Sequence, residues 1–187
     1  SGQGADATIE CPATAVFTDP TVSDDCDANV VIMSSDVSNL DACGTGTITR
    51  TWTAVDCAGN AATPVSQTIT IEDTTAPVLS GQGADATIEC PATAVFTAPT
   101  VTDNCDPAVV ISFTDNSILD ACGEGTITRT WTAIDCAGNA ATPVTQTITI
   151  EDTTAPVLTG QGADATIECP ATAVFTAPTV TDNCDPA

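Results

Sequence analysis

The chain of 187 residues carries 25 acidic and only two basic residues, which gives a formal net charge of −23. A surface this acidic repels nucleic acid and anionic membranes, because phosphate binding needs clusters of Lys and Arg. Histidine and lysine are absent, which excludes Ser–His, Cys–His and lysine-based nucleophilic catalysis, so we expect no enzyme.

From the N-terminus, short segments of alternating polarity predict β-strands, and no stretch shows a helical period. Pro12 ends the first strand, and Pro20 belongs at an edge or bulge. Strands are expected at 5–11, 15–17 and 29–33, with 21–23 as an open continuation of the second strand and 34–39 as a variable connection or a short edge strand.

The clearest element is a hairpin formed by 47–54 and 64–71, joined by a turn at Gly59-Asn60. Apolar and threonine side chains alternate along both segments, so one face is predicted to be buried. Arg50 shares that face, and we expect it to lie along the indole or to pair with a loop carboxylate such as Asp41. The predicted core consists of Ile48, Trp52, Ala54, Ile69 and Ile71, with Trp131 as the second buried tryptophan.

The sequence repeats every 79 residues, since the segment that begins at Ser1 returns at Ser80 and again at Thr159. A period of this length matches a small folded domain rather than a solenoid turn. We therefore expect tandem immunoglobulin-like Greek-key β-sandwiches of about seven strands each, arranged end to end. The predicted domains are 1–73, without its N-terminal linker strand, a complete repeat at 74–152 and a partial repeat at 153–187.

Ten cysteines without histidine indicate disulfides made in an oxidising, extracellular setting rather than zinc ligands. Cys43 and Cys57 flank one extended strand and are too far apart to bond. Loops at a common end of a Greek-key sandwich favour bonds within each repeat, each worth about 3–4 kcal/mol in the chain-entropy model. The predicted pairs are Cys11–Cys43, Cys26–Cys57, Cys90–Cys122 and Cys105–Cys136.

Three motifs resemble a known family: Thr-Ala-Val-Asp-Cys-Ala-Gly-Asn ending at 60, Thr-Val-Thr-Asp-Asn-Cys-Asp ending at 106, and Glu-Asp-Thr-Thr-Ala-Pro-Val ending at 78. Together they resemble the hyalin-repeat (HYR-like) immunoglobulin-type domains over the whole chain. The version with four cysteines resembles repeats of very large bacterial surface proteins, including gliding-motility adhesins. The resemblance implies a stalk or filament without catalytic residues.

Acidic loops are predicted to meet where one repeat joins the next, and clustered oxygen ligands suit calcium. The alternative is a solvated acidic surface whose Asp and Asn residues form turns. No other cofactor is expected. The candidate ligands are Glu72, Asp73, Asp103, Asn104, Asp106 and Asp135.

Two further surface features have simple structural explanations. Thr74 and Thr153, in Asp-Thr-Thr motifs, are candidate O-glycosylation sites, although polar linkers explain the same residues. Threonines on the exposed hairpin face could form a hydroxyl array for ice or sugar, but β-propensity accounts for them.

Together with the repeats and cysteines, the resemblance implies a structural stalk segment of an extracellular bacterial adhesin. Its expected partners are neighbouring repeats of the same long chain and other copies in a fibre, with neither nucleic acid nor direct membrane insertion. The alternative is a ligand- or glycan-binding module that uses the variable segment 33–39 and its counterpart 112–118.

Overall fold

The computed structural model describes residues 2–185, and these residues form strands, turns and irregular segments without a helix. No helix long and apolar enough to cross a membrane occurs in this described range. The strands are β1 (Ala7–Glu10), β2 (Val31–Leu40), β3 (Gly46–Val55), β4 (Val65–Glu72), β5 (Val78–Ser80), β6 (Ala86–Glu89), β7 (Thr100–Thr102), β8 (Val110–Leu119), β9 (Gly125–Ile134), β10 (Val144–Glu151), β11 (Val157–Thr159) and β12 (Thr179–Thr181).

The chain divides into two compact units, and the limits of these units do not follow the 79-residue period. Unit 1 contains Ser1–Leu79, Val101–Ile111 and Ala133–Thr142. Unit 2 contains Ser80–Thr100, Ser112–Thr132 and Pro143–Ala187. Unit 1 therefore combines the strands of the first repeat with two loop segments of the second repeat, and this composition positions the site described below.

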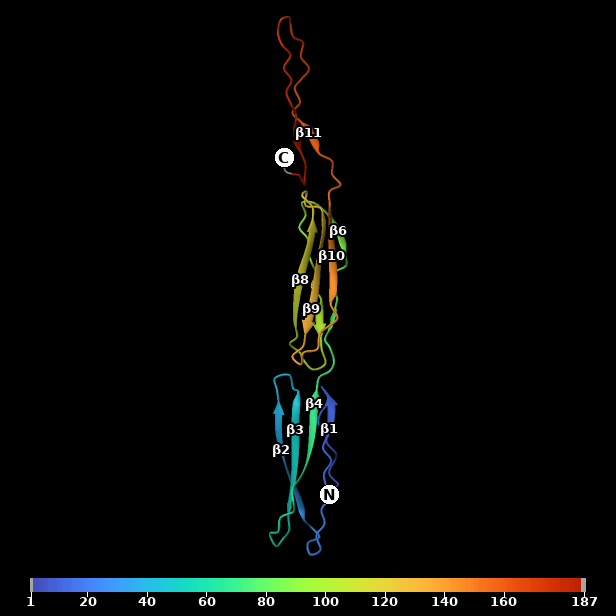
Figure 1. Cartoon of the computed structure of the whole chain (residues 1–187), viewed down its shortest axis with the longest axis vertical. Coiled ribbons are helices and arrows are strands. Elements are labelled where there is room, and N and C mark those ends of the chain that lie inside the picture. The colour runs from blue at the N-terminus through green and yellow to red at the C-terminus, as the bar shows by residue number, and fades with distance from the viewer. Residues whose placement is uncertain (1, 186–187) are drawn as a thin grey trace. The chain divides into compact units, whose positions relative to one another are not determined.

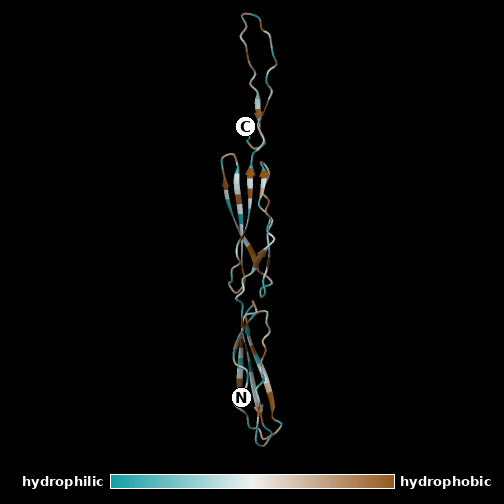
Figure 2. Cartoon of the chain, turned by 90° about the vertical axis from the view of Figure 1, so that its right-hand side faces the viewer, coloured by the Kyte–Doolittle hydropathy of each residue, from teal (hydrophilic) through white to brown (hydrophobic). Residues whose placement is uncertain are grey.

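The sheet of unit 1 has the order β1-β4-β3-β2, with β1 parallel to β4 and the other pairs antiparallel (Figure 1). The predicted hairpin is β3 and β4, and its register pairs Ile48 with Ile69 and Trp52 with Val65. Trp52 is 2 % exposed and Ile69 is 3 % exposed. Figure 2 shows polar and apolar residues alternating along the strands, which is the pattern of a half-buried sheet.

The second repeat forms the same four-stranded sheet, in the order β6-β10-β9-β8, and a separate pair of strands, β5-β7. These elements confirm the predicted all-β immunoglobulin-like class. The segment 15–17 lies outside the strands, and 21–23 is irregular, although its counterpart forms β7. The variable segment belongs to the long edge strand β2, so the edge-strand alternative holds there.

A buried glutamine joins the irregular N-terminal segments to the sheet, which the apolar pattern did not reveal. The Gln67 amide donates to the Ala5 carbonyl oxygen at 2.7 Å and its oxygen accepts the Thr18 N–H at 3.1 Å. Gln146 repeats both contacts with Ala84 and Thr97. Because buried amides need partners, these bonds fix segments that form no strand of their own.

The predicted partner of Arg50 is wrong. Its guanidinium donates two bonds to Asp36 on the neighbouring strand, at 2.7 and 2.8 Å, and lies 4.5 Å from the centre of the Phe17 ring rather than along the indole. Asp41 instead accepts the backbone N–H groups of Cys43 and Thr45 in its own turn. The β2–β3 register pairs Asp36 with Arg50 directly, so the strand supplies the nearer carboxylate.

Candidate functional site

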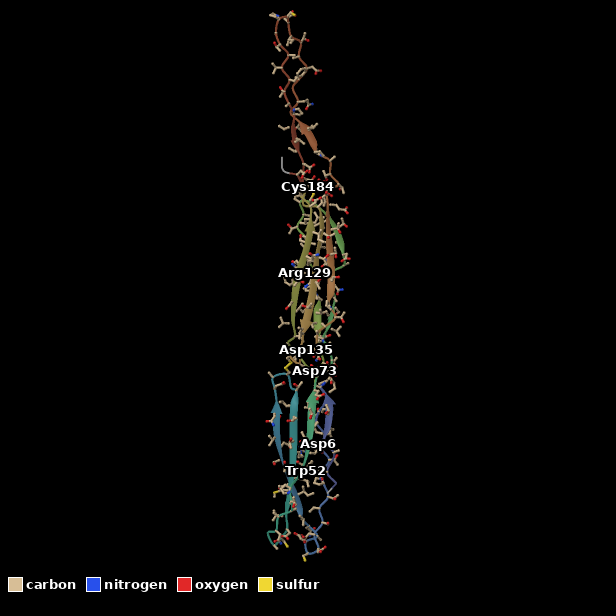
Figure 3. The ribbon with its side chains drawn as sticks, viewed as in Figure 1. Asp6, Trp52, Asp73, Arg129, Asp135 and Cys184 are labelled. Carbon is tan, nitrogen blue, oxygen red and sulfur yellow. A yellow bond between two sulfur atoms is a disulfide. The ribbon has the colours of Figure 1, made fainter. Side chains whose placement is uncertain are left out.

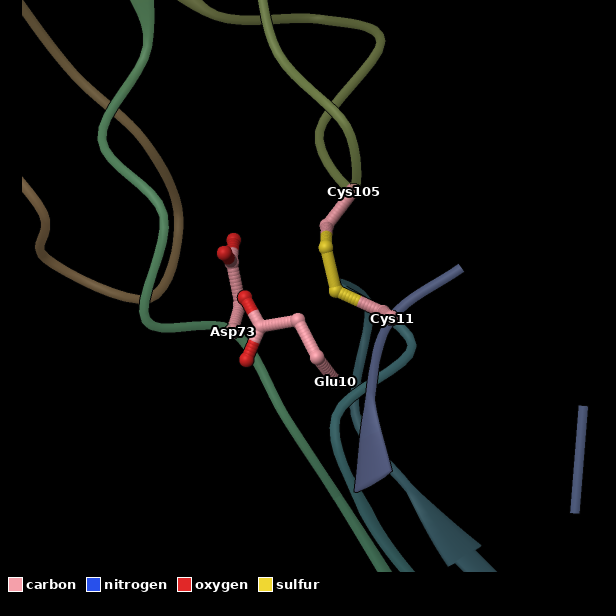
Figure 4. Close-up of side chains that lie close together, drawn as sticks. All are labelled: Glu10, Cys11, Asp73 and Cys105. Atoms are coloured by element: carbon pink, nitrogen blue, oxygen red, sulfur yellow. A yellow bond between two sulfur atoms is a disulfide. The ribbon is translucent and has the colours of Figure 1, made fainter. Parts of the chain in front are cut away.

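Three disulfides connect consecutive repeats. Cys11 bonds Cys105 and Cys43 bonds Cys136 in unit 1, with Cα–Cα distances of 5.6 and 5.9 Å. In unit 2, Cys90 bonds Cys184, with a Cα–Cα distance of 5.5 Å. Figure 4 shows the Cys11–Cys105 bond beside two acidic side chains. Each pair is 93 or 94 residues apart in the sequence, which is more than one repeat.

The predicted pairing within repeats is therefore wrong. Cys11 bonds Cys105 instead of Cys43, Cys136 bonds Cys43 instead of Cys105, and Cys90 bonds Cys184 instead of Cys122. Cys26 and Cys57 are exposed and carry no disulfide.

Sheet order explains the failure for Cys11 and Cys43. Both residues lie at the same end of the sheet, as the Greek-key argument required. However, Cys11 follows β1 at one edge, while Cys43 lies in the β2–β3 turn at the other edge. With strands about 4.8 Å apart, two or more strand spacings separate the two cysteines by about 10 Å or more, whereas a disulfide needs Cα atoms within about 7 Å.

The bonds follow one rule: the first and third cysteines of a repeat bond the second and fourth cysteines of the next repeat. Four cysteines are free and exposed in the structure, namely Cys26, Cys57, Cys122 and Cys169. For each of them, the position that the rule assigns to its partner falls outside residues 1–187. The rule therefore describes the six bonded cysteines of this chain.

Three carboxylates converge in unit 1. Asp73 follows β4, Asp103 follows β7, and Asp135 follows β9. One oxygen from each lies within 4.8 Å of the others. Asp73 is 8 % exposed and Asp135 is 5 % exposed, and Figure 3 labels both in this region. These three residues are the part of the predicted calcium ligand set that the fold brings together.

Local hydrogen bonds fix each carboxylate but leave two of their oxygens unused. Asp103 Oδ1 accepts the N–H groups of Cys105 and Asp106, both at 2.8 Å, and Asp73 Oδ1 accepts the Thr75 N–H at 3.1 Å. The Oδ2 atoms of Asp73 and Asp103 are buried without a hydrogen-bond partner within the described chain. A buried carboxylate oxygen without a partner is costly.

The pKa values of two carboxylates in the cluster are shifted in opposite directions. Burial raises the pKa of Asp73, and the charges of Asp103 and Asp135 add to this rise, although a bond from Thr75 opposes it. Burial also acts to raise the pKa of Asp135, but the bonds from the Asn139 side chain and from the backbone N–H groups of residues 137–139 together outweigh it, so the pKa is lowered. Asp135 is thus held as a carboxylate, while Asp73 is ionised at a cost.

The other predicted ligands have different contacts. The Asn104 amide donates to the Cys11 carbonyl oxygen at 2.8 Å. Asp106 accepts the N–H groups of Ala108 and Cys136, at 2.8 and 3.1 Å. Glu72 has an exposed side chain, and its carbonyl oxygen accepts the Cys11 N–H at 3.0 Å. Asn104 and Asp106 thus hold the loop beside the cluster, and the carboxylates of Asp106 and Glu72 are not among the three that converge there.

Sequence reasoning missed Glu10, which lies beside Asp73 and the disulfide in Figure 4. Its carboxylate accepts the N–H of Thr74 and the hydroxyls of Thr74 and Thr75, at 2.9 to 3.0 Å. The bond from the Thr74 backbone is the largest influence that lowers the pKa of Glu10. One signal was available in the sequence: Glu10 lies at the end of a predicted strand, as Glu72 does just before Asp-Thr-Thr. The structure pairs these two glutamates in register.

Glu10 and Asp73 also lie close to the sulfur atoms of Cys11 and Cys105, a grouping typical of metal sites. Because these sulfurs form a disulfide, they offer no thiolate to a metal. At the predicted glycosylation positions, the hydroxyls of Thr74 and Thr153 donate to Glu10 and Glu89 at 3.0 and 2.8 Å. Linker packing thus gives both hydroxyls a structural role, and glycosylation there stays a prediction.

The fold and its bonds define a class: disulfide-linked tandem immunoglobulin-like repeats with acidic loops. The model of the HYR-like domain with 4 cysteines matches residues 2–71 and 79–150. The chain belongs to this family. It is also 34 % identical over 186 residues to hyalin of Strongylocentrotus purpuratus, an alignment that covers 89 % of this chain and 15 % of hyalin. The chain therefore spans a small part of the length of that relative.

Solved structures with similar features include cadherin ectodomains, at low similarity. The human desmocollin-1 ectodomain matches with a TM-score of 0.32 and 14 % identity, covering 96 % of this chain and 45 % of that one. A two-domain fragment of human protocadherin-24 matches with a TM-score of 0.35 and 16 % identity, covering 79 % and 94 %. Similarity at this level assigns no function.

Proposed function

We propose that this chain is a non-catalytic segment of the stalk of an extracellular bacterial surface adhesin, to which it gives length and stiffness. Membership of the HYR-like family and the repeated sequence support this role. Disulfides are typical of proteins outside the reducing cytosol, and the four-cysteine pattern resembles repeats of large bacterial surface proteins. The partners proposed are neighbouring repeats and other copies of the protein in a fibre.

The observation that carries the proposal is the covalent path through the disulfides. From Ser1 it runs ten residues to Cys11 and crosses to Cys105. It then follows fifteen residues back to Cys90, crosses to Cys184, and ends three residues later. Tension applied at the two ends is therefore carried by about 28 residues instead of 187.

This bonding pattern limits how far the protein can stretch. At about 3.5 Å per extended residue, the path through the disulfides reaches about 110 Å, whereas the whole backbone reaches about 650 Å. Each additional repeat joined by the same rule adds one fifteen-residue segment, such as 90–105, to this path. A stalk built in this way keeps its length under load because unfolding a repeat releases little chain.

Single-molecule force spectroscopy tests the proposal on the oxidised chain held at its two ends. We expect a final extension of about 110 Å, rising to about 650 Å after reduction. Bonds confined to single repeats would leave about 122 residues stretchable, or about 430 Å. An oxidised extension near that value would contradict both the bonding pattern and the load-bearing role.

The alternative, a binding module, has one observation in its favour. The edge strands β2 and β8 expose apolar side chains, including Met33 at 56 % and Phe113 at 55 %. Exposed apolar side chains on an unpaired strand edge suit peptide or glycan contacts. Exchange of 33–39 with 112–118 would then change binding on a glycan array, whereas the stalk hypothesis expects no binding before or after the exchange.

A further inference from the structure

We propose that Asp73, Asp103 and Asp135 bind one calcium ion in unit 1. The proposal rests on geometry and charge within this unit and does not depend on the stalk function. A cluster of acidic side chains alone would not justify it. The additional observation is that the Asp73 side chain is almost fully buried, with the residue only 8 % exposed, and that its Oδ2 atom has no hydrogen-bond partner in the described chain.

The charges at this position lack compensation from the protein. Three carboxylates supply negative charge within a few ångströms, and the sequence contains no lysine. The two arginines are bonded to Asp36 and Asp115 at 2.7 Å. A cation between the three carboxylates would give the Oδ2 atoms of Asp73 and Asp103 a ligand and remove the mutual repulsion.

The donor set favours calcium over zinc. Calcium binds six to eight oxygens at about 2.3–2.6 Å, so two oxygens on one ion lie at most about 5 Å apart. The three carboxylate oxygens, all within 4.8 Å of one another, meet this limit without any movement. Zinc favours nitrogen and thiolate sulfur, and the adjacent sulfurs are held in a disulfide. Water and second carboxylate oxygens would complete the shell.

Each ligand is already oriented by its own turn, which lowers the cost of binding. Thr75 holds Asp73, the N–H groups of Cys105 and Asp106 hold Asp103, and Asn139 holds Asp135. The Asn139 amide also donates to the Asp73 carbonyl oxygen at 3.1 Å. A bound ion would therefore join three segments that already contact one another, the linker after β4 and two loops of the second repeat.

The chain offers its own control. Asp152 in unit 2 corresponds to Asp73, and Asp182 corresponds to Asp103, but the counterpart of Asp135 would lie beyond residue 187. We therefore expect one complete site in this chain. Asp152→Asn removes the same functional group from the same linker sequence and should leave calcium binding unchanged.

Isothermal titration calorimetry with calcium chloride tests the proposal on the oxidised full chain, in physiological salt with magnesium present to suppress non-specific binding. We expect one strong equivalent per chain. Asp73→Asn and Asp135→Asn should each weaken its affinity by about tenfold or more, since calcium affinity follows ligand charge. Asp152→Asn should bind as the unchanged chain does.

Thermal unfolding distinguishes a lost calcium ligand from a general loss of stability, because only a lost ligand makes the order of the melting temperatures depend on calcium. With a chelator, Asp73→Asn should melt at or above the temperature of the unchanged chain, because it removes a buried charge. With calcium, the order should reverse. If no calcium ion binds tightly to the unchanged chain, or if Asp73→Asn binds calcium with equal affinity, the proposed site is wrong. The stalk proposal would be unaffected, because the extension under force tests it separately.

Discussion

The linkers 72–79 and 151–158 have identical sequences, yet their acidic side chains differ in environment. In both, the two threonines of the linker donate to a glutamate at the end of an earlier strand, Glu10 or Glu89. In both, an asparagine amide also donates to a cysteine carbonyl oxygen at 2.8 Å. Asp73, however, is buried among two other carboxylates. Asp152 is only half-buried, and its N–H donates to Glu124 at 2.7 Å.

The difference arises from one turn. In unit 1, the Asp135–Asn139 turn of the second repeat lies against the Asp73 linker, and Cys136 within that turn bonds Cys43. Unit 2 has no counterpart of this turn among its described residues. The linker and the disulfide that both units share therefore do not make the proposed metal site by themselves. The Asp135–Asn139 turn of the following repeat completes it.

The largest expected effect is a difference between the two disulfides of unit 1, because only the Cys11–Cys105 bond lies on the shortest covalent path that carries tension. Cys11→Ser with Cys105→Ser diverts the path through Cys43 and Cys136 and lengthens it to about 91 residues, so the extension under force should rise about threefold, to about 330 Å. Cys43→Ser with Cys136→Ser should leave it near 110 Å. Equal extensions for both double variants would contradict the path.

Removing the Cys43–Cys136 bond should make unit 1 more like unit 2. We expect the free energy of unfolding of unit 1 to fall by about 2–4 kcal/mol. Urea unfolding can follow each unit separately, with Trp131→Phe leaving Trp52 to report unit 1 and Trp52→Phe leaving Trp131 to report unit 2. Cys122→Ser, which removes a free thiol, is the control. An equal loss in both units would show that the bond does not act locally.

The pH dependence should have opposite signs at Glu89 and Asp73. Bonds from the Thr153 backbone and hydroxyl, and from Thr154, lower the pKa of Glu89 from 4.5 to about 2. Its carboxylate therefore stabilises the fold above pH 4.5, and this contribution is lost as the pH falls toward 2. The raised pKa of Asp73 makes its ionised form unfavourable, and this cost is relieved as the pH falls.

Unfolding of Glu89→Gln and Asp73→Asn across pH, with chelator present, measures both signs. Glu89→Gln should be less stable than the unchanged chain at pH 6 and equal to it near pH 2. Asp73→Asn should be at least as stable at pH 6, with its advantage shrinking in acid. Parallel curves for the two variants would contradict this assignment.

The smallest expected effect concerns a natural difference between the repeats. Trp52 Nε1 donates to Asp19 Oδ1 at 2.9 Å, whereas the second repeat has Ala98 at the corresponding position. Asp19→Ala should destabilise unit 1 by about 1 kcal/mol, measured through Trp52 fluorescence in urea. Phe17→Leu, which alters the adjacent ring packing but keeps this bond, separates the hydrogen bond from general core loosening. An unchanged stability in Asp19→Ala would mean that water replaces the carboxylate fully.

The strands were predictable where side-chain period alone decides the structure. The hairpin, its buried tryptophan and its threonine face follow from alternation, and Thr49 and Thr68 are indeed neighbours, with hydroxyl oxygens 3.0 Å apart. The partner of Arg50 was not predictable, because it depends on the register between β2 and β3. Gln67 was also missed, since a polar residue in a strand does not reveal which irregular segment will cover it.

The sequence by itself determined the all-β class, the 79-residue period, the ten cysteines that predict disulfides, and the set of acids from which a site could be made. Only the tertiary structure decided which cysteines bond and which acids meet. The physical reason is that β4 lies between β1, which ends next to Cys11, and the β3–β2 pair whose turn holds Cys43, so loops at one end of a sheet are still too far apart. The loops of the next repeat come closer, and they supply both the disulfide partners and two of the three carboxylates.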